Sequence, residues 1–147
     1  SLGEVEGKKT FLLEFPRVGI PHGSENLVKW LLDKDYLPVI VHPERNTVFV
    51  EQRPKLQALT DMGCLLQITA SSITGKFGKE AQQMTEELLT TNQVSAIASD
   101  CHNLKGRAPD LLAGYNAAVK IVGKERADEI VNDIPQKLLV NNFSLHI

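Results

Sequence analysis

The sequence predicts an α/β protein built on a parallel sheet. Short, continuously apolar runs recur along the chain, and longer amphipathic segments lie between them. A strand followed by a helix and a second strand forms a right-handed unit whose strands are parallel. Four strands of this kind are enough for an open sheet or for part of a barrel. We expect a single domain over residues 1–147, because neither a linker nor an internal repeat divides the chain.

Four apolar runs have the length of strands that are buried on both faces. They cover residues 10–15, 37–41, 64–69 and 94–99. Strands of a parallel sheet are covered by helices, so their apolar residues follow one another without alternation. Each run is therefore predicted to lie inside the core.

The segments between these runs are predicted to be helices. Ser24 is expected to cap the first helix, whose apolar face includes Leu31. The segment 54–63 begins with Pro and ends with Gly, which is typical of a complete helix. Apolar residues also recur at helical spacing over residues 79–90 and 109–122.

Composition limits the classes of function. The chain is 42% hydrophobic and 23% charged, with a formal charge of -2, as expected for an ordinary soluble protein. This balance gives no basic excess and argues against a nucleic-acid partner. No apolar run approaches the roughly 20 residues that cross a bilayer, so we expect no membrane insertion and a cytoplasmic location.

The two cysteines, Cys64 and Cys101, are expected to be free thiols, because a cytosolic chain of this size does not need a bridge. Residues 1–9 are expected to be a tag remnant or a disordered lead-in. The chain begins without methionine, and we expect it to be a fragment of a longer protein.

Residues that can bind metals lie at the ends of three predicted strands. Glu14 is near the end of the first strand, and His42 directly follows the second. Asp100 and His102 directly follow the fourth. In a parallel sheet these ends share one edge, where active sites are built. Carboxylates and imidazoles without thiolates favour divalent ions such as Mn, Fe or Zn, so we expect a metal site at this edge.

Two arginines, Arg45 and Arg107, emerge from the same loops. A guanidinium fork matches pairs of phosphate oxygens, and divalent metals can activate water for attack on phosphorus. The residues therefore predict a metal-dependent phosphoester hydrolase in which both arginines neutralise phosphoryl charge. Glu44 is expected either to orient Arg45 or a ligand imidazole, or to be an exposed loop carboxylate.

Other candidates are weaker. His22 is expected to be a loop residue, and His146 to lie in a C-terminal tail that frays. Lys76 and Lys79 are expected to be surface residues of a mobile loop over the edge of the site. A complete phosphate-binding glycine motif is absent around them.

Cys101 and Arg107 also fit the C-x5-R spacing of cysteine phosphatases. Such enzymes need a thiolate at neutral pH, but the Asp100 carboxylate next to the thiol disfavours it and repels a phosphate dianion. The loop also has a single glycine, which suits it poorly to wrapping amides around an anion. Thiol chemistry therefore stays a minor alternative.

Four motifs in order, at residues 11–16, 39–46, 66–78 and 99–107, together resemble the bacterial CpsB/CapC-type protein-tyrosine phosphatases. These enzymes belong to the polymerase and histidinol phosphatase (PHP) superfamily. The resemblance implies a distorted (β/α)7 barrel with a cluster of divalent metals, commonly manganese. It also implies phosphotyrosine on proteins as substrate, often the tail of a bacterial tyrosine kinase that controls capsule or exopolysaccharide assembly.

The resemblance also implies roles for single residues. The family's metal ligands match Glu14, His42, Asp100 and His102. The arginines that hold phosphate in the family match Arg45 and Arg107. One departure is large, because nothing upstream of Glu14 matches the His-x-His and further ligands with which the family begins.

The chain is therefore expected to be the C-terminal portion of such a barrel, lacking its N-terminal strands. An open barrel exposes strand edges and apolar helix faces, so we expect self-association, and an incomplete metal cluster predicts weak or absent activity. Two alternatives stay open. The first is a phosphoesterase for small molecules such as histidinol phosphate, and the second is a non-catalytic metal-binding or scaffold domain.

Overall fold

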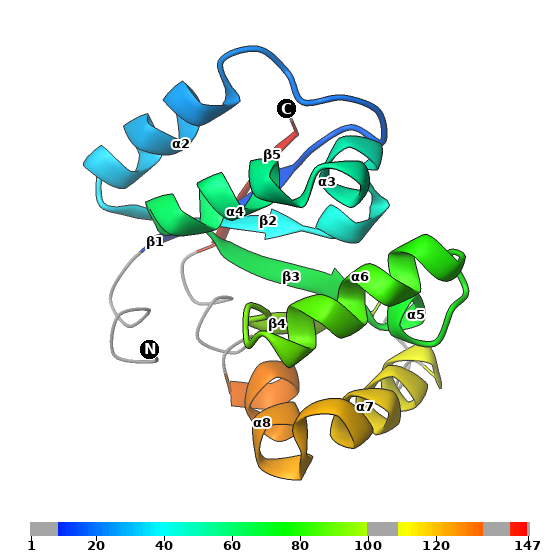
Figure 1. Ribbon diagram of the computed structural model, residues 1–147. Coiled ribbons are helices and arrows are strands. Elements are labelled where there is room, and N and C mark those ends of the chain that lie inside the picture. The colour runs from blue at the N-terminus through cyan, green and yellow to red at the C-terminus, as the bar shows by residue number, and fades with distance from the viewer. Residues whose placement is uncertain (1–8, 100–108, 134–141, 147) are drawn as a thin grey trace.

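Five parallel strands form one sheet in the computed structural model, which describes residues 9–99, 109–133 and 142–146. The strands are ordered β4-β3-β2-β1-β5, and all neighbours are parallel (Figure 1). Their bounds are Lys9–Glu14 (β1), Tyr36–Val41 (β2), Leu65–Thr69 (β3), Ala96–Ala98 (β4) and Asn142–His146 (β5). The predicted α/β class with a parallel sheet is confirmed.

Strand β5 contradicts the prediction of a frayed tail around His146. It pairs with β1 and places His146 opposite Glu14 in the register. Residues 142–146 alternate polar and apolar side chains, as in a strand with one solvated face. Strands inside the sheet carry continuous apolar runs instead. A search for continuous runs therefore misses β5.

Helical segments connect the strands. In Figure 1, α2, α4, α6 and α8 follow one another from the top of the view to the bottom. The bounds are Ser24–Asp33 (α2), Pro43–Arg45 (η1, a 3-10 turn), Thr47–Glu51 (α3), Arg53–Met62 (α4), Ala70–Ile73 (α5), Lys79–Thr90 (α6), Pro109–Val122 (α7), Lys124–Asp128 (α8) and Glu129–Asp133 (η2, a π-helical turn).

The start of α2 differs from the prediction. Ser24 is the first residue of the helix, and Gly23, with a φ of 86°, takes the N-cap position. The Ser24 hydroxyl donates a hydrogen bond to the Pro21 carbonyl oxygen at 2.5 Å, so it closes the preceding turn instead of capping the helix. Helix α4 follows the prediction, with proline in its first turn and Gly63 at its C-cap.

The core lies around the central strands. Val39 and Ile40 of β2 and Leu66 and Ile68 of β3 are fully buried. Cys64, just before β3, is buried with them, and burial raises the pKa of its thiol to about 12. A thiol with this pKa stays protonated at neutral pH, so Cys64 acts as a small apolar core residue. It is a free cysteine, as predicted.

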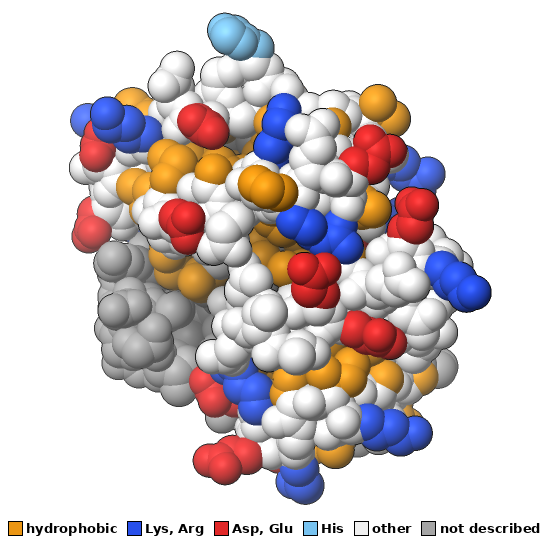
Figure 2. All heavy atoms as spheres, viewed as in Figure 1, with side chains coloured by type: hydrophobic (Ala, Val, Ile, Leu, Met, Phe, Trp, Pro, Cys, Tyr) orange, Lys and Arg blue, Asp and Glu red, His pale blue; other side chains and the backbone are white. Residues whose placement is uncertain are grey.

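The face seen in Figure 1 carries side chains of both charge signs, which are interspersed with small apolar areas (Figure 2). Over the described part of the molecule, three large apolar side chains are exposed: Val18, Trp30 and Leu112. Within the same ranges, no helix combines the length and the apolarity that crossing a lipid bilayer requires.

Helices α5 and α7 approach each other closely at Gly114. A Cβ atom added to Gly114 would lie 2.6 Å from the Cβ atom of Ala70 and 2.9 Å from its backbone. Contacts this short do not occur between carbon atoms, so the helix packing requires glycine at this position. This packing holds α7 against the end of β3, where α5 begins.

We predict that Gly114→Ala destabilises the protein by about 1–3 kcal/mol, because the added methyl group forces α7 away from α5. In an exposed helix the same change is stabilising by up to about 1 kcal/mol. Urea unfolding followed by circular dichroism measures the difference. Asn116→Ala, an exposed position on the same helix, is the control and should leave stability nearly unchanged. A Gly114→Ala protein as stable as the wild type would contradict the close packing.

Candidate functional site

Glu14 and His42 meet at one edge of the sheet. Glu14 is the last residue of β1, and His42 directly follows β2. The parallel register pairs Leu13 with Ile40, so both chain segments leave the sheet at the same edge. The Nε2 atom of His42 lies 2.8 Å from Oε1 of Glu14, and the carboxylate accepts the hydrogen bond. The side chains are 24% exposed for His42 and 37% for Glu14, so a ligand from solvent can reach them.

The backbone of His42 has a conformation that is uncommon for a residue with a side chain. Its φ of 38° and ψ of 55° lie in the left-handed region. The His42 amide donates to the Gln67 carbonyl of β3 at 2.7 Å, and the His42 carbonyl accepts from the Arg45 amide at 3.0 Å. These bonds hold the strained residue in place, as is common at functional sites. They turn the chain so that Arg45 follows His42 at the same edge.

Glu44 is buried, so the prediction of an exposed loop carboxylate is wrong. Its side chain is only 2% exposed and accepts a hydrogen bond from the Thr69 amide at 2.9 Å. Burial raises the pKa of the Glu44 carboxyl, and the hydrogen bond from the Thr69 amide offsets part of this effect. Because Thr69 is the last residue of β3, Glu44 ties the turn η1 to the neighbouring strand.

Asn46 joins the loops that follow β1 and β2. Its Nδ2 group donates to the carbonyl oxygens of Pro16 at 2.7 Å and of Gly19 at 2.8 Å. Its Oδ1 atom caps α3 by accepting from the Phe49 amide at 2.9 Å. The Asn46 side chain is almost completely buried, so these three bonds are shielded from water.

Arg17 lies at the site and was not among the predicted site residues. The Thr47 amide donates to its carbonyl oxygen at 2.9 Å, which fixes the Arg17 backbone beside the turn that carries Arg45. A pocket of about 260 Å³ is lined by both arginines together with Glu14 and His42. A signal for Arg17 was present in the sequence, because it follows Glu14 by three residues, as Arg45 follows His42.

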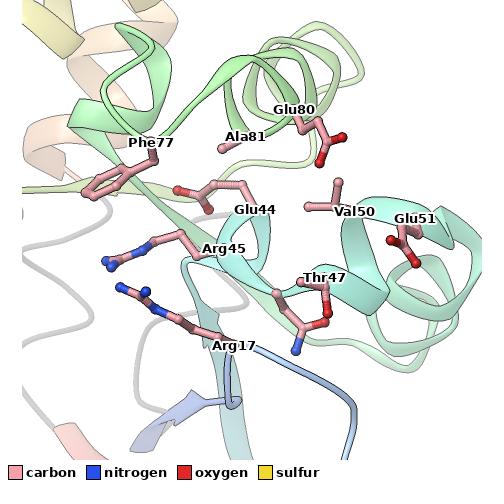
Figure 3. A pocket seen from close by; sticks show the side chains of 10 residues that line it. Arg17, Glu44, Arg45, Thr47, Val50, Glu51, Phe77, Glu80 and Ala81 are labelled. Atoms are coloured by element: carbon pink, nitrogen blue, oxygen red, sulfur yellow. The ribbon is translucent and has the colours of Figure 1, made fainter.

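The two arginines also line a second pocket, on the side of α3 and α6 (Figure 3). There the guanidinium carbon of Arg45 lies 4.3 Å from the centroid of the Phe77 ring. This cation–π contact orients the guanidinium group. Phe77 lies in a turn between α5 and α6 in which the Lys76 amide bonds to Ser71 and the Gly78 amide to Gly75. The segment is thus a turn closed by hydrogen bonds. Lys76 and Lys79 are exposed, as predicted, but Lys79 is the first residue of α6 and not part of a loop.

Asp100, His102 and Arg107, the other predicted site residues, lie outside the described residues, as does Cys101. The residues that flank this segment are described, and they contact each other. The Ser99 hydroxyl donates to Asp110, at 2.9 Å from Oδ1 and 3.1 Å from Oδ2. Ser99 follows β4 and Asp110 lies in the first turn of α7, so both flanks are at the edge of the sheet that carries Glu14 and His42.

Glu14 and His42 fit part of a divalent-cation site. One carboxylate oxygen and one imidazole nitrogen, 2.8 Å apart and open to solvent, are donors that suit Mn, Fe and Zn. Among the side chains that the structure describes, no further histidine, cysteine or acidic group joins them to form a group of three. Their role as metal ligands therefore stays a prediction.

Comparison with known proteins identifies relatives. Residues 2–140 match the family model described as "Capsular polysaccharide synthesis, CpsB/CapC". The chain is 40% identical over 99 residues to the tyrosine-protein phosphatase YwqE of Bacillus subtilis. This alignment covers 67% of this chain and 39% of that protein. It is also 33% identical over 115 residues to the tyrosine-protein phosphatase CpsB of Streptococcus agalactiae. This alignment covers 72% of this chain and 46% of that protein.

A solved structure is similar as well. It belongs to a study of YwqE from Bacillus subtilis and CpsB from Streptococcus pneumoniae, described as unique metal-dependent tyrosine phosphatases. The TM-score is 0.81 at 33% identity, and the match covers 94% of this chain and 56% of the solved chain. The chain thus spans less than half the length of the two curated relatives and somewhat more than half of the solved one.

We predict that Asn46→Ala destabilises the protein by about 2 kcal/mol or more, because it removes a helix cap and leaves the Pro16 and Gly19 carbonyl groups without their donor. Urea unfolding measures the change. Asn26→Ala, at an exposed position in α2, is the matched control and should cost little. Equal stability of the two variants would show that Asn46 does not hold the loops together.

Proposed function

Because the chain belongs to the CpsB/CapC family, we propose that it carries part of the active site of a metal-dependent protein-tyrosine phosphatase. The observation that carries this proposal is the pairing of Glu14 with His42 in a pocket that Arg45 also lines. A metal-binding pair next to a guanidinium group suits the cleavage of a phosphomonoester. The relatives named as tyrosine-protein phosphatases support the same chemistry.

In the proposed site, Glu14 and His42 hold divalent cations, with manganese as the preferred ion. Such cations lower the pKa of water and stabilise negative charge on phosphoryl oxygens when they are bound. Asp100 and His102 are proposed as further ligands on the basis of the sequence motif. The hydrogen bond between Glu14 and His42 keeps the two donors close together before an ion binds.

Arg45 is proposed to bind the phosphoryl group and to neutralise charge that develops during transfer. Its guanidinium group is oriented from one side by the Phe77 ring and from the backbone by the bond to His42. Oriented donors act in the transition state without first having to reorganise, which is the usual source of such stabilisation. Arg107 is proposed as a second phosphate-binding arginine.

The fold is proposed to be part of a distorted (β/α)7 barrel. Each of β1 to β4 lies beside the strand that precedes or follows it in the chain. With right-handed crossovers, this order puts successive helices on the same face of the sheet, as in a barrel. A doubly wound sheet reverses its strand order and has helices on both faces. The order of β1 to β4 therefore supports a barrel. The place of β5 beside β1 fits both folds, because the last strand of a barrel lies beside the first and a doubly wound sheet reverses its order at such a point.

The proposed substrate is phosphotyrosine on a protein that acts in capsular or exopolysaccharide synthesis, such as the tail of a bacterial tyrosine kinase. The family description and the names of the relatives support this class of substrate. The alternative substrate, a small phosphoester, is distinguished by the assay below.

The test is hydrolysis of a phosphotyrosine peptide and of histidinol phosphate by the 147-residue chain, with the Bacillus subtilis phosphatase as positive control. We expect turnover of the peptide in preference to the small ester, at a rate below that of the control. EDTA should abolish the rate, and His42→Ala should lower it by about 100-fold or more.

Cys101→Ser is the matched control for thiol chemistry and should keep the wild-type rate. A rate that survives EDTA but is lost in Cys101→Ser would refute the metal mechanism and establish a cysteine nucleophile. Metal binding without turnover of either ester would favour the non-catalytic domain.

A further inference from the structure

Arg17 is an arginine at the site that was not among the residues predicted from the sequence. It is exposed, and it lines both the pocket of Glu14 and His42 and the pocket on the side of α3 and α6. Figure 3 shows the Arg17 and Arg45 side chains extending in the same direction. Arg17 makes no ion pair with any residue in the described ranges.

The position of Arg17 is set by buried hydrogen bonds. Asn46 binds the carbonyl groups of Pro16 and Gly19, on either side of Arg17, and the Thr47 amide binds the Arg17 carbonyl itself. The loop is therefore fastened to the turn that carries Arg45. An ordinary surface arginine on a mobile loop has no such attachment. The backbone of Arg17 is thus held in place, and its side chain is exposed.

The charges at this point favour an anion. Two guanidinium groups at one pocket repel each other and are best accommodated when a negative group lies between them. Glu14, which lines the same pocket, supplies one negative charge against these two positive ones, so the three groups keep a net positive charge. A phosphomonoester carries a charge near -2 at neutral pH, and two guanidinium forks match both its charge and its oxygens.

We infer that Arg17 is a further arginine, in addition to Arg45 and Arg107, that binds the phosphoryl group of the substrate, from the side opposite Phe77. This inference rests on the proposed function, because it takes the pocket of Glu14 and His42 to be the phosphoryl site. The Arg45 side chain is oriented by Phe77 and the η1 turn. In Arg17 only the backbone is held by such contacts, and the side chain is exposed. Arg17 therefore binds substrate and transition state alike, so its loss raises KM and leaves kcat nearly unchanged.

The test is binding of inorganic phosphate and of phosphotyrosine to the full chain in EDTA, measured by amide chemical shifts in NMR spectra. Arg17→Ala should weaken binding by roughly ten-fold, which is the usual effect of losing a charge-assisted hydrogen bond. Arg17→Lys keeps the charge without the fork and should recover part of the loss. Lys34→Ala, an exposed residue at the opposite end of α2, removes an equal charge and should have no effect beyond about two-fold.

Three results would overturn the inference. The first is unchanged binding in Arg17→Ala, and the second is an equal loss in Lys34→Ala, which would reflect net charge alone. The third is a wild-type chain that does not bind millimolar phosphate. The unchanged amide spectrum of each variant outside the site confirms that it is folded.

Hydrolysis separates this inference from the proposed function. A chain that binds phosphate through Arg17 but hydrolyses neither ester would contradict the turnover expected of this chain and keep the anion site. A chain that hydrolyses the peptide with the same KM in Arg17→Ala would keep the phosphatase proposal and refute the role of Arg17.

Discussion

The parallel pairing of β1 with β2 determines what the site can contain. Its register places the last residue of β1 beside the residue that follows β2, so Glu14 and His42 meet although 28 residues separate them in the chain. A slip of one residue would turn the Glu14 side chain to the other face of the sheet. The apolar residues of β1 and β2 pack in the core and thereby fix this register. The site at the edge of the sheet therefore has a fixed geometry.

The loops at this edge are held by buried polar groups. Glu44 fastens the η1 turn to β3, and Asn46 fastens the loop after β1 to the same turn. Burying a carboxylate is costly, as the raised pKa of Glu44 shows. The hydrogen bond from the Thr69 amide offsets part of this cost, so Glu44 can hold the turn that positions His42 and Arg45. Side chains that never touch the substrate thus position those proposed to bind it.

How much could be predicted from the sequence depended on how local each feature is. The strands β1 to β4 were predictable from continuous apolar runs, and the meeting of Glu14 with His42 followed from their places at strand ends. Strand β5 was not, because its alternating pattern fits an edge strand or a tail equally well. The burial of Glu44 and the placement of Arg17 depend on hydrogen bonds to Thr69 and Asn46, which lie 25 or more residues away. No local pattern reveals such partners.

The central claim is that Glu14 and His42 together hold a divalent cation. Substoichiometric Mn²⁺ added to the ¹⁵N-labelled chain tests it most directly, because the ion broadens the amide signals of nearby residues. The strongest broadening is expected at the end of β1 and in the turn after β2, with loss of this effect in Glu14→Gln and in His42→Ala. Broadening centred elsewhere, such as on the acidic residues of α6, or broadening that both variants retain, would contradict it.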